Sequence, residues 1–144
     1  LNNGNIERAN EFLGRPFLFT GIVVEGKRLG RELGFPTLNI EVNNEHKILP
    51  KDGVYAVKVQ IQDQHFKGMM NIGQNPTVQN NAEQEKKLEV HIFDFDKEVY
   101  GAEVKVFFQK FVRDEKTFSN LEELKSQLIQ DEKSVRTYFN TVRI

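Results

Sequence analysis

The alternation of apolar and polar residues predicts β-strands along most of the chain. Residues 88–95 form the clearest strand, because Leu88, Val90 and Ile92 would share one face and Glu89 the other. Five more segments have strand-like composition, and short turns join most of them; they begin at Phe17, Thr37, Val54, His65 and Val104. Six strands with short connections predict a mostly β fold, an antiparallel barrel or sandwich.

Two neighbouring strands are expected to pair as a hairpin. Residues 54–61 and 65–72 are separated only by a short polar turn at residues 62–64. The second strand is predicted to end in the turn-forming residues 71–77. The strongly polar stretch at 80–87 is predicted to be an exposed, mobile loop.

Both ends of the chain have helical spacing. Residues 1–14 predict a short helix that ends at Gly14, and because the first residue is not methionine we expect it to be a linker from an upstream domain. Near the C-terminus, Ser119 and Glu122 predict a capping box. One kinked helix or two short helices should follow, with two apolar stripes: Leu121, Leu124, Leu128 and Ile129, then Val135, Tyr138, Phe139 and Val142.

The composition narrows the class of protein. The chain has 144 residues, which suits one domain, and 20 basic residues nearly balance 21 acidic ones. This balance argues against a protein that grips nucleic acid through its phosphates. The chain has no cysteine, and His46, His65 and His91 lack zinc-site spacing. No stretch suits a membrane span or a signal peptide, so a cytoplasmic domain is expected.

The richest candidate chemistry lies in residues 30–39, Gly-Arg-Glu-Leu-Gly-Phe-Pro-Thr-Leu-Asn. Pro36 restricts the local backbone, and Thr37 and Asn39 flank Leu38 so that both polar groups would share one face of an extended chain. Two neutral oxygen ligands suit a magnesium ion that already carries phosphates. The alternative interpretation is a glycine-rich turn that leads into a strand with a solvated polar face.

A nearby segment imitates a phosphate-binding P-loop. Residues 21–27 have a glycine, four residues and then Gly-Lys, but Arg28 follows where the motif needs Ser or Thr. The interior of the segment is Ile-Val-Val-Glu, whose β-branched residues are typical of a strand rather than a phosphate loop. We therefore reject a P-loop. If the chain binds a nucleotide without one, its loops must close over the phosphates, and the candidates to move are Gly26, Gly30 and Gly34 and the polar residues 80–87.

Glu89 is the candidate general base. It lies on the polar register of its strand beside apolar residues, where a carboxylate can accept a proton from a hydroxyl. The alternatives are that Glu89 is an ordinary exposed glutamate, or that His91 on the same face is the base. Asp94 and Asp96 are typical of an acidic turn, and Arg113 could bind an anion or pair with its acidic neighbours.

The chain contains six short sequence blocks in a defined order. They begin at Gly21, Leu33, Gly53, Asn71, Leu88 and Phe111. No single block is specific, but their order is, and in this order they make the chain resemble riboflavin kinase. The resemblance runs from about residue 14 to the C-terminus, so residues 15–144 are expected to be the kinase domain. The lead-in before residue 17 is similar to the linker of the bacterial bifunctional riboflavin kinase/FAD synthetase.

The resemblance implies a six-stranded antiparallel Greek-key barrel with a C-terminal helical segment. It implies transfer of the ATP γ-phosphate to the ribityl 5′-hydroxyl of riboflavin, which gives FMN. By this resemblance Thr37 and Asn39 hold Mg²⁺ with ATP, and Glu89 is the base. Leu38 departs from the alanine usual in the family, which is expected to change packing alone. The nucleotide would be covered by Gly26, Arg31 and Gly34.

The same resemblance assigns Arg113, Glu115 and Phe118 to the flavin site. It implies small-molecule substrates with no nucleic acid and no membrane as partner. It also implies an upstream nucleotidylyltransferase domain, which makes FAD from FMN, in the full-length protein.

Two other functions stay open on sequence alone. A barrel of the OB type could bind oligonucleotides, although it would need a basic groove with interleaved aromatic residues. The second open function is a regulatory module that binds flavin without catalysis. The presence of Thr37, Asn39 and Glu89 argues against it.

Overall fold

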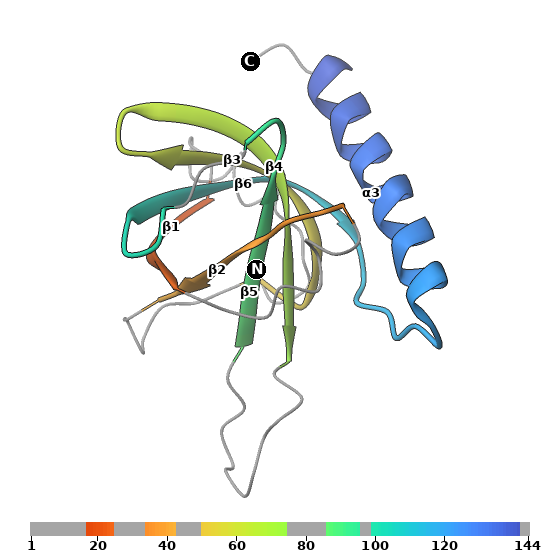
Figure 1. Cartoon of the computed structure of the whole chain (residues 1–144). Helices are drawn as coiled ribbons and strands as arrows, with labels where there is room; N and C mark the ends of the chain where they lie inside the picture. The colour runs from red at the N-terminus through yellow and green to blue at the C-terminus, as the bar shows by residue number, and fades with distance from the viewer. Residues whose placement is uncertain (1–16, 25–33, 43–49, 75–85, 96–98, 142–144) are drawn as a thin grey trace, which may run out of the picture.

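The computed structural model describes residues 17–24, 34–42, 50–74, 86–95 and 99–141. Within them the chain forms six strands and one long C-terminal helix (Figure 1). The linker helix expected over residues 1–14 lies outside this described part. The elements are β1 (Phe17–Val24), β2 (Leu38–Glu41), β3 (Gly53–Ile61), β4 (Gln64–Gln74), β5 (Lys86–Ile92), β6 (Glu103–Arg113) and α3 (Leu121–Thr141).

The strands close into a barrel in the order β1-β2-β5-β4-β3-β6, and every pairing is antiparallel. β3, β4 and β5 follow one another as neighbours, and β6 returns to lie beside β3. The spatial order β6-β3-β4-β5 is that of a Greek key. The predicted fold class is therefore confirmed, and so is the β3–β4 hairpin, which turns at Gln62 with a positive φ of 56°.

Alternate residues of all six strands fill the barrel interior. On β5, Leu88, Val90 and Ile92 are buried inside, as the alternation predicts. Glu89, which alternates with them, therefore points to the outer face of the barrel. This division matters for function, because polar side chains that neighbour one another on the outer face can act on a ligand while the interior stays apolar.

Helix α3 packs on the outside of the barrel (Figure 1). Val135 and Phe139 of the helix are buried in a second apolar cluster, distinct from the barrel interior. β3 is consequently buried on both faces along much of its length. The other buried members of this outer cluster are Phe35, Val54, Ala56, Met69 and Phe93.

The C-terminal segment corrects three details of the sequence prediction. It is one continuous helix rather than a kinked helix or two short ones. Its cap is Asn120, whose Oδ1 accepts a hydrogen bond from the Glu123 N–H at 2.9 Å, whereas the predicted box used Ser119 and Glu122. Val135 and Phe139 of the second predicted stripe are buried as expected, together with Asp131, whereas Leu121 and Ile129 of the first stripe are exposed. The outer surface of the barrel thus selects mainly the second stripe for burial.

The course of β4 is a further correction, and it bears on the site. The predicted strand ends at residue 72 and residues 73–74 are predicted to be turn residues, but they continue β4, and residues 71–74 pair with the first half of β5. The extended pairing places Asn71 directly opposite Glu89. The predicted loop at 80–87 lies mostly outside the described residues, although Lys86 and Lys87 already belong to β5.

Candidate active site on the outer face of the barrel

One row of directly opposed residues crosses all six strands. Residues opposite each other in antiparallel strands point to the same face, with Cβ atoms about 5 Å apart. Asn39, Glu89 and Arg113, all singled out from the sequence, lie in this row although they come from distant parts of the chain. In order around the barrel the row is Val24, Asn39, Glu89, Asn71, Val54 and Arg113.

The candidate metal pair lies at the β2 end of this row. Leu38 packs against the barrel interior, and its neighbours Thr37 and Asn39 are half-buried. Thr37 just precedes β2 instead of belonging to it. In the described part of the chain, no group of three or more His, Cys, Asp or Glu side chains could hold a metal ion. Thr37 and Asn39 offer neutral oxygens, a donor type that Mg²⁺ accepts when phosphate and water supply its remaining ligands.

Glu89 occupies the centre of the row, between Asn39 and Asn71. Its side chain is 23% exposed, and its Oε1 lies 2.9 Å from the Nζ of Lys87 on the same strand. The carboxylate is thus within reach of solvent and of a ligand on the outer face. A partly exposed carboxylate on this face can accept the proton of a substrate hydroxyl that lies against it.

A second carboxylate, that of Glu115, approaches the row from the segment after β6. It accepts a hydrogen bond from the Asn71 side chain, and it lies over Gly73, where a methyl group would collide with it. Partial desolvation of this carboxyl group raises the pKa of Glu115, although the residue as a whole is exposed, and the bond from Asn71 and the charge of Arg113 oppose the rise. Asn71 therefore lies beside two acids, Glu89 and Glu115.

We expect Glu115→Gln to increase the free energy of unfolding at pH 7. A carboxyl group with a raised pKa in the folded state destabilises that state once it ionises, so stability falls as the pH rises past the unfolded-state pKa. The gain should vanish below about pH 4, where the acid is neutral in both states. Urea unfolding at both pH values measures it, with the exposed Glu103→Gln as control. A Glu115→Gln protein that is less stable at pH 7 would contradict the expectation.

Arg113 is held by helix α3. Its Nε and Nη2 each donate to the Asp131 carboxylate at 2.8 Å, and its Nη1 donates to the Asp114 carbonyl at 2.9 Å. Gln127 also donates to Asp131, at 2.9 Å, and accepts from Lys116 at 3.2 Å. The guanidinium therefore anchors the start of the segment that carries Glu115 to the helix.

The structure describes only two of the four remaining predicted site residues, Phe118 and Gly34. Phe118 is half-buried at the end of the same segment, just before α3. Gly34 is exposed with a φ of +87°, a left-handed conformation that glycine adopts without strain. Gly26 and Arg31 lie outside the described residues.

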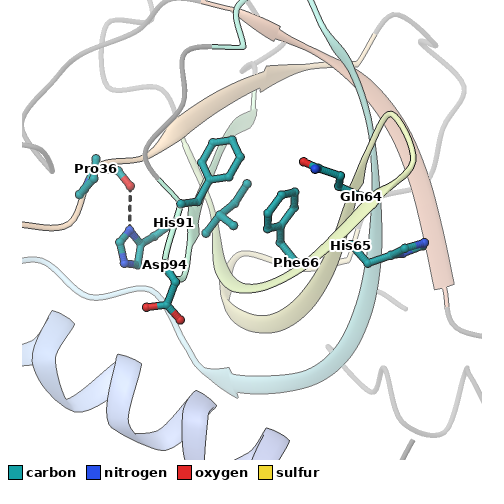
Figure 2. A pocket seen from close by; sticks show the side chains of 8 residues that line it. Pro36, Gln64, His65, Phe66, His91 and Asp94 are labelled. Carbon is teal, nitrogen blue, oxygen red and sulfur yellow. Dashed lines mark hydrogen bonds between the residues drawn. The ribbon is translucent and has the colours of Figure 1, made fainter.

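An open cavity of about 890 Å³ lies next to Pro36 (Figure 2). Pro36 and His91 line one side of it, with Gln64 and His65 across from them. The ring centroids of Phe66 and Phe95 lie 4.9 Å apart in an edge-to-face arrangement, so the cavity wall is partly aromatic. Pro36 immediately precedes the candidate metal ligand Thr37 in the chain and thereby links the cavity lining to the metal pair.

Two residues of this site are not candidates on sequence alone. Asn71 lies where a predicted strand meets a predicted turn, and only the strand pairing puts it opposite Glu89. Asp131 lies between the two predicted apolar stripes of the helix, and its side chain is 2% exposed and binds Arg113. An acidic residue between apolar helical stripes was the available signal.

A family model described as riboflavin kinase matches residues 13–139 of the chain. The bifunctional riboflavin kinase/FMN adenylyltransferase of Bacillus subtilis is 41% identical over 143 residues, covering 99% of this chain and 45% of that protein. The protein of the same name from Listeria monocytogenes is 40% identical over 139 residues, covering 96% and 43%. The chain thus spans less than half the length of these relatives.

Solved structures agree on the fold. A crystal structure of a macrolide-efflux protein from Streptococcus pneumoniae matches with a TM-score of 0.86 and 37% identity, covering 94% of this chain and 43% of that one. Riboflavin kinase from Trypanosoma brucei matches with a TM-score of 0.59 and 23% identity, covering 88% and 81%. Within the described residues, no helix of this chain is long and apolar enough to cross a membrane.

Proposed function

The chain belongs to the riboflavin kinase family and carries that family's kinase domain, and we propose that it transfers the γ-phosphate of ATP to the ribityl 5′-hydroxyl of riboflavin. The observation that carries the proposal is the order of the outer-face row. The candidate metal ligand Asn39, the candidate base Glu89 and the flavin-side residues Asn71 and Arg113 follow one another around the barrel.

This order corresponds to a phosphate that passes from ATP on the Asn39 side of the row to a hydroxyl on the Asn71 side. Thr37 and Asn39 would hold Mg²⁺, which when bound neutralises charge on the ATP phosphates. Glu89 would accept the proton of the attacking hydroxyl from a position between the two substrates. Phosphoryl transfer asks a protein mainly to position its substrates and to stabilise charge, and these residues supply both.

We assign the base end of the nucleotide to the cavity beside Pro36. Its volume lies within the usual range for small-molecule sites, and its aromatic wall suits a planar base. A nucleotide that enters there would extend its phosphates along Pro36 toward Thr37. Gly34, with its left-handed backbone, is close in sequence to this cavity and is suited to a loop that changes conformation over ATP. We extend this cover to Gly26 and Arg31.

The flavin would lie on the other side of Glu89. Glu115 and Phe118 belong to the segment between β6 and α3, and Arg113 ties that segment to the helix. Glu115 also reaches Asn71, which is opposite Glu89. These contacts support an acceptor site that is built from β4, the 113–118 segment and the start of α3.

For the whole protein we propose a second activity, FMN adenylyltransferase, in a domain upstream of this one. The relatives that share this kinase region carry both activities in their names, and this chain matches less than half of their length. The direct test of the kinase proposal is conversion of riboflavin to FMN by the purified chain with Mg²⁺ and ATP. Absence of FMN under these conditions would overturn it.

We expect the double variant Thr37→Ala/Asn39→Ala to lose magnesium-dependent binding of ATP. Removing both neutral oxygen donors should weaken Mg·ATP binding by at least ~10-fold, the loss already typical of removing groups that merely orient metal ligands. Titration calorimetry with Mg·ATP measures this effect, and metal-free ATP provides the reference. Asn140→Ala, in an exposed position on α3, is the control variant. Unchanged affinity for Mg·ATP would remove the metal assignment.

A further inference from the structure

The His91 ring makes a short hydrogen bond to the segment that contains the proposed metal ligands. Its Nδ1 lies 2.7 Å from the carbonyl oxygen of Pro36 (Figure 2). A carbonyl oxygen can only accept, so Nδ1 carries the proton and donates. The other ring nitrogen, Nε2, faces Oε1 of Glu132 on α3 at 4.0 Å. The geometry thus specifies one tautomer for a neutral ring.

Packing holds this ring in place. The side chain is only 12% exposed. The ring of Phe35 packs edge to face against the imidazole with 5.4 Å between ring centroids, and the ring of Phe93 does so with 5.7 Å. Both phenylalanines belong to the apolar cluster beneath α3. The ring therefore has one orientation, and in this orientation its donor points at Pro36.

The segment that His91 contacts is anchored by the buried Phe35 on one side of Pro36 and by strand β2 on the other. Pro36 has no backbone N–H, so its carbonyl is the group through which the backbone at this residue can be held. The pairing of β2 with β5 begins at Leu38 opposite Val90, one residue beyond Thr37. Thr37 consequently enters the site ahead of the first strand pair, and its preceding peptide carbonyl is the group that His91 binds.

We propose that His91 is a positioning residue for the metal site. By holding the Pro36 carbonyl, it orients the peptide that joins Pro36 to Thr37 and so presents the Thr37 hydroxyl on the face shared by Asn39 and Glu89. The proposal rests on the assignment of Thr37 and Asn39 as metal ligands. It gives His91 a role that is separate from the proton transfer at Glu89.

The first experiment uses the unaltered chain without ligand. Long-range proton–nitrogen NMR of the imidazole ring distinguishes the two neutral tautomers. The proposal expects the Nδ1–H form at His91, which is held by the Pro36 carbonyl. The Nε2–H form would overturn it, and this readout depends neither on a variant that must fold nor on activity.

The second experiment compares two replacements by calorimetry, with Mg·ATP and with metal-free ATP. His91→Phe keeps a ring to pack against Phe35 and Phe93 but has no donor, and the loss of one hydrogen bond should weaken Mg·ATP binding by about 3- to 10-fold. Affinity for metal-free ATP should fall less than affinity for Mg·ATP, because His91 lines the cavity assigned to the base but its Nδ1–H donor acts on the metal site. His91→Asn places an amide N–H near the position of Nδ1, so it should restore much of the lost affinity. Thermal unfolding confirms that both variants are folded.

Three results separate the possible explanations. Equal weakening of metal-free ATP in His91→Phe would mean that the ring touches the nucleotide itself, and this would overturn the positioning role. Unchanged Mg·ATP affinity would overturn it as well. In steady-state assays the expected effect is a higher KM for Mg·ATP with an unchanged KM for riboflavin.

Failure of this inference is distinct from failure of the proposed function. If the wild-type chain makes FMN but His91→Phe binds Mg·ATP normally, only the role of His91 is wrong. If the wild-type chain makes no FMN, the proposed function is wrong. The tautomer and the metal-dependent binding would still support His91 as the residue that orders Thr37.

Discussion

Replacing Glu89 by glutamine is expected to reduce the rate of FMN formation by about 10²- to 10⁴-fold, the usual contribution of a general base. Glutamine keeps the size and the polar contacts of the side chain but cannot take up the proton of the riboflavin hydroxyl. The row of opposed residues puts Glu89 between the metal side at Asn39 and the acceptor side at Asn71. No other outer-face carboxylate among the described strands occupies that central position in the row.

The change should appear in kcat and leave substrate binding largely intact. Single-turnover formation of FMN measures the chemical step, and quenching of riboflavin fluorescence measures binding. Glu103→Gln, an exposed strand glutamate on β6, is the matched control and should keep wild-type turnover. A Glu89→Gln enzyme with near wild-type turnover would exclude Glu89 as the base.

Replacing Asp131 by alanine is expected to lower the free energy of unfolding by about 3–5 kcal/mol, the cost typical of removing one partner from a buried ion pair. The Asp131 side chain is 2% exposed, and that of Arg113 is 13% exposed. Alanine would leave the guanidinium largely buried without the carboxylate that now accepts two hydrogen bonds from it. Urea unfolding followed by circular dichroism measures the loss.

Two further variants identify the origin of this loss. Arg113→Met with Asp131→Leu removes both charges, and it should recover much of the stability, because a buried pair can often be replaced by apolar residues at little cost. Asp114→Ala breaks an ion pair with Lys51 in which the aspartate is 75% exposed, so it should cost at most about 1 kcal/mol. If Asp131→Ala costs no more than Asp114→Ala, the buried pair does not stabilise the fold as argued here.

Comparison of the Glu89 and Asp131 variants also separates chemistry from architecture. Glu89 lies at the reacting hydroxyl in the proposed function, whereas Asp131 acts through Arg113 and the segment that leads to Glu115. A partly folded Asp131 variant should therefore lose affinity for riboflavin before it loses the ability to bind Mg·ATP. This difference follows from the position of the 113–118 segment on the acceptor side of the row.

Local sequence patterns specify most of the strands, the barrel class and much of the candidate chemistry. Alternation along residues 88–95 put Glu89 on the opposite face from Leu88 and Val90, and the structure agrees. Period-two alternation is a local property, since each side chain's face follows from its position in the strand. The Thr37–Asn39 spacing and the order of the six motifs can likewise be read directly from the amino-acid sequence.

Which of these residues lie side by side depends on the tertiary structure. Strand register depends on pairing between distant segments, so the alignment of Asn39, Glu89 and Asn71 could not be inferred from any one strand. The buried stripe of α3 was set by the outer surface of the barrel, which made Asp131 a buried partner of Arg113 and left Leu121 exposed. Local periodicity thus specifies faces, and long-range pairing and packing specify the site.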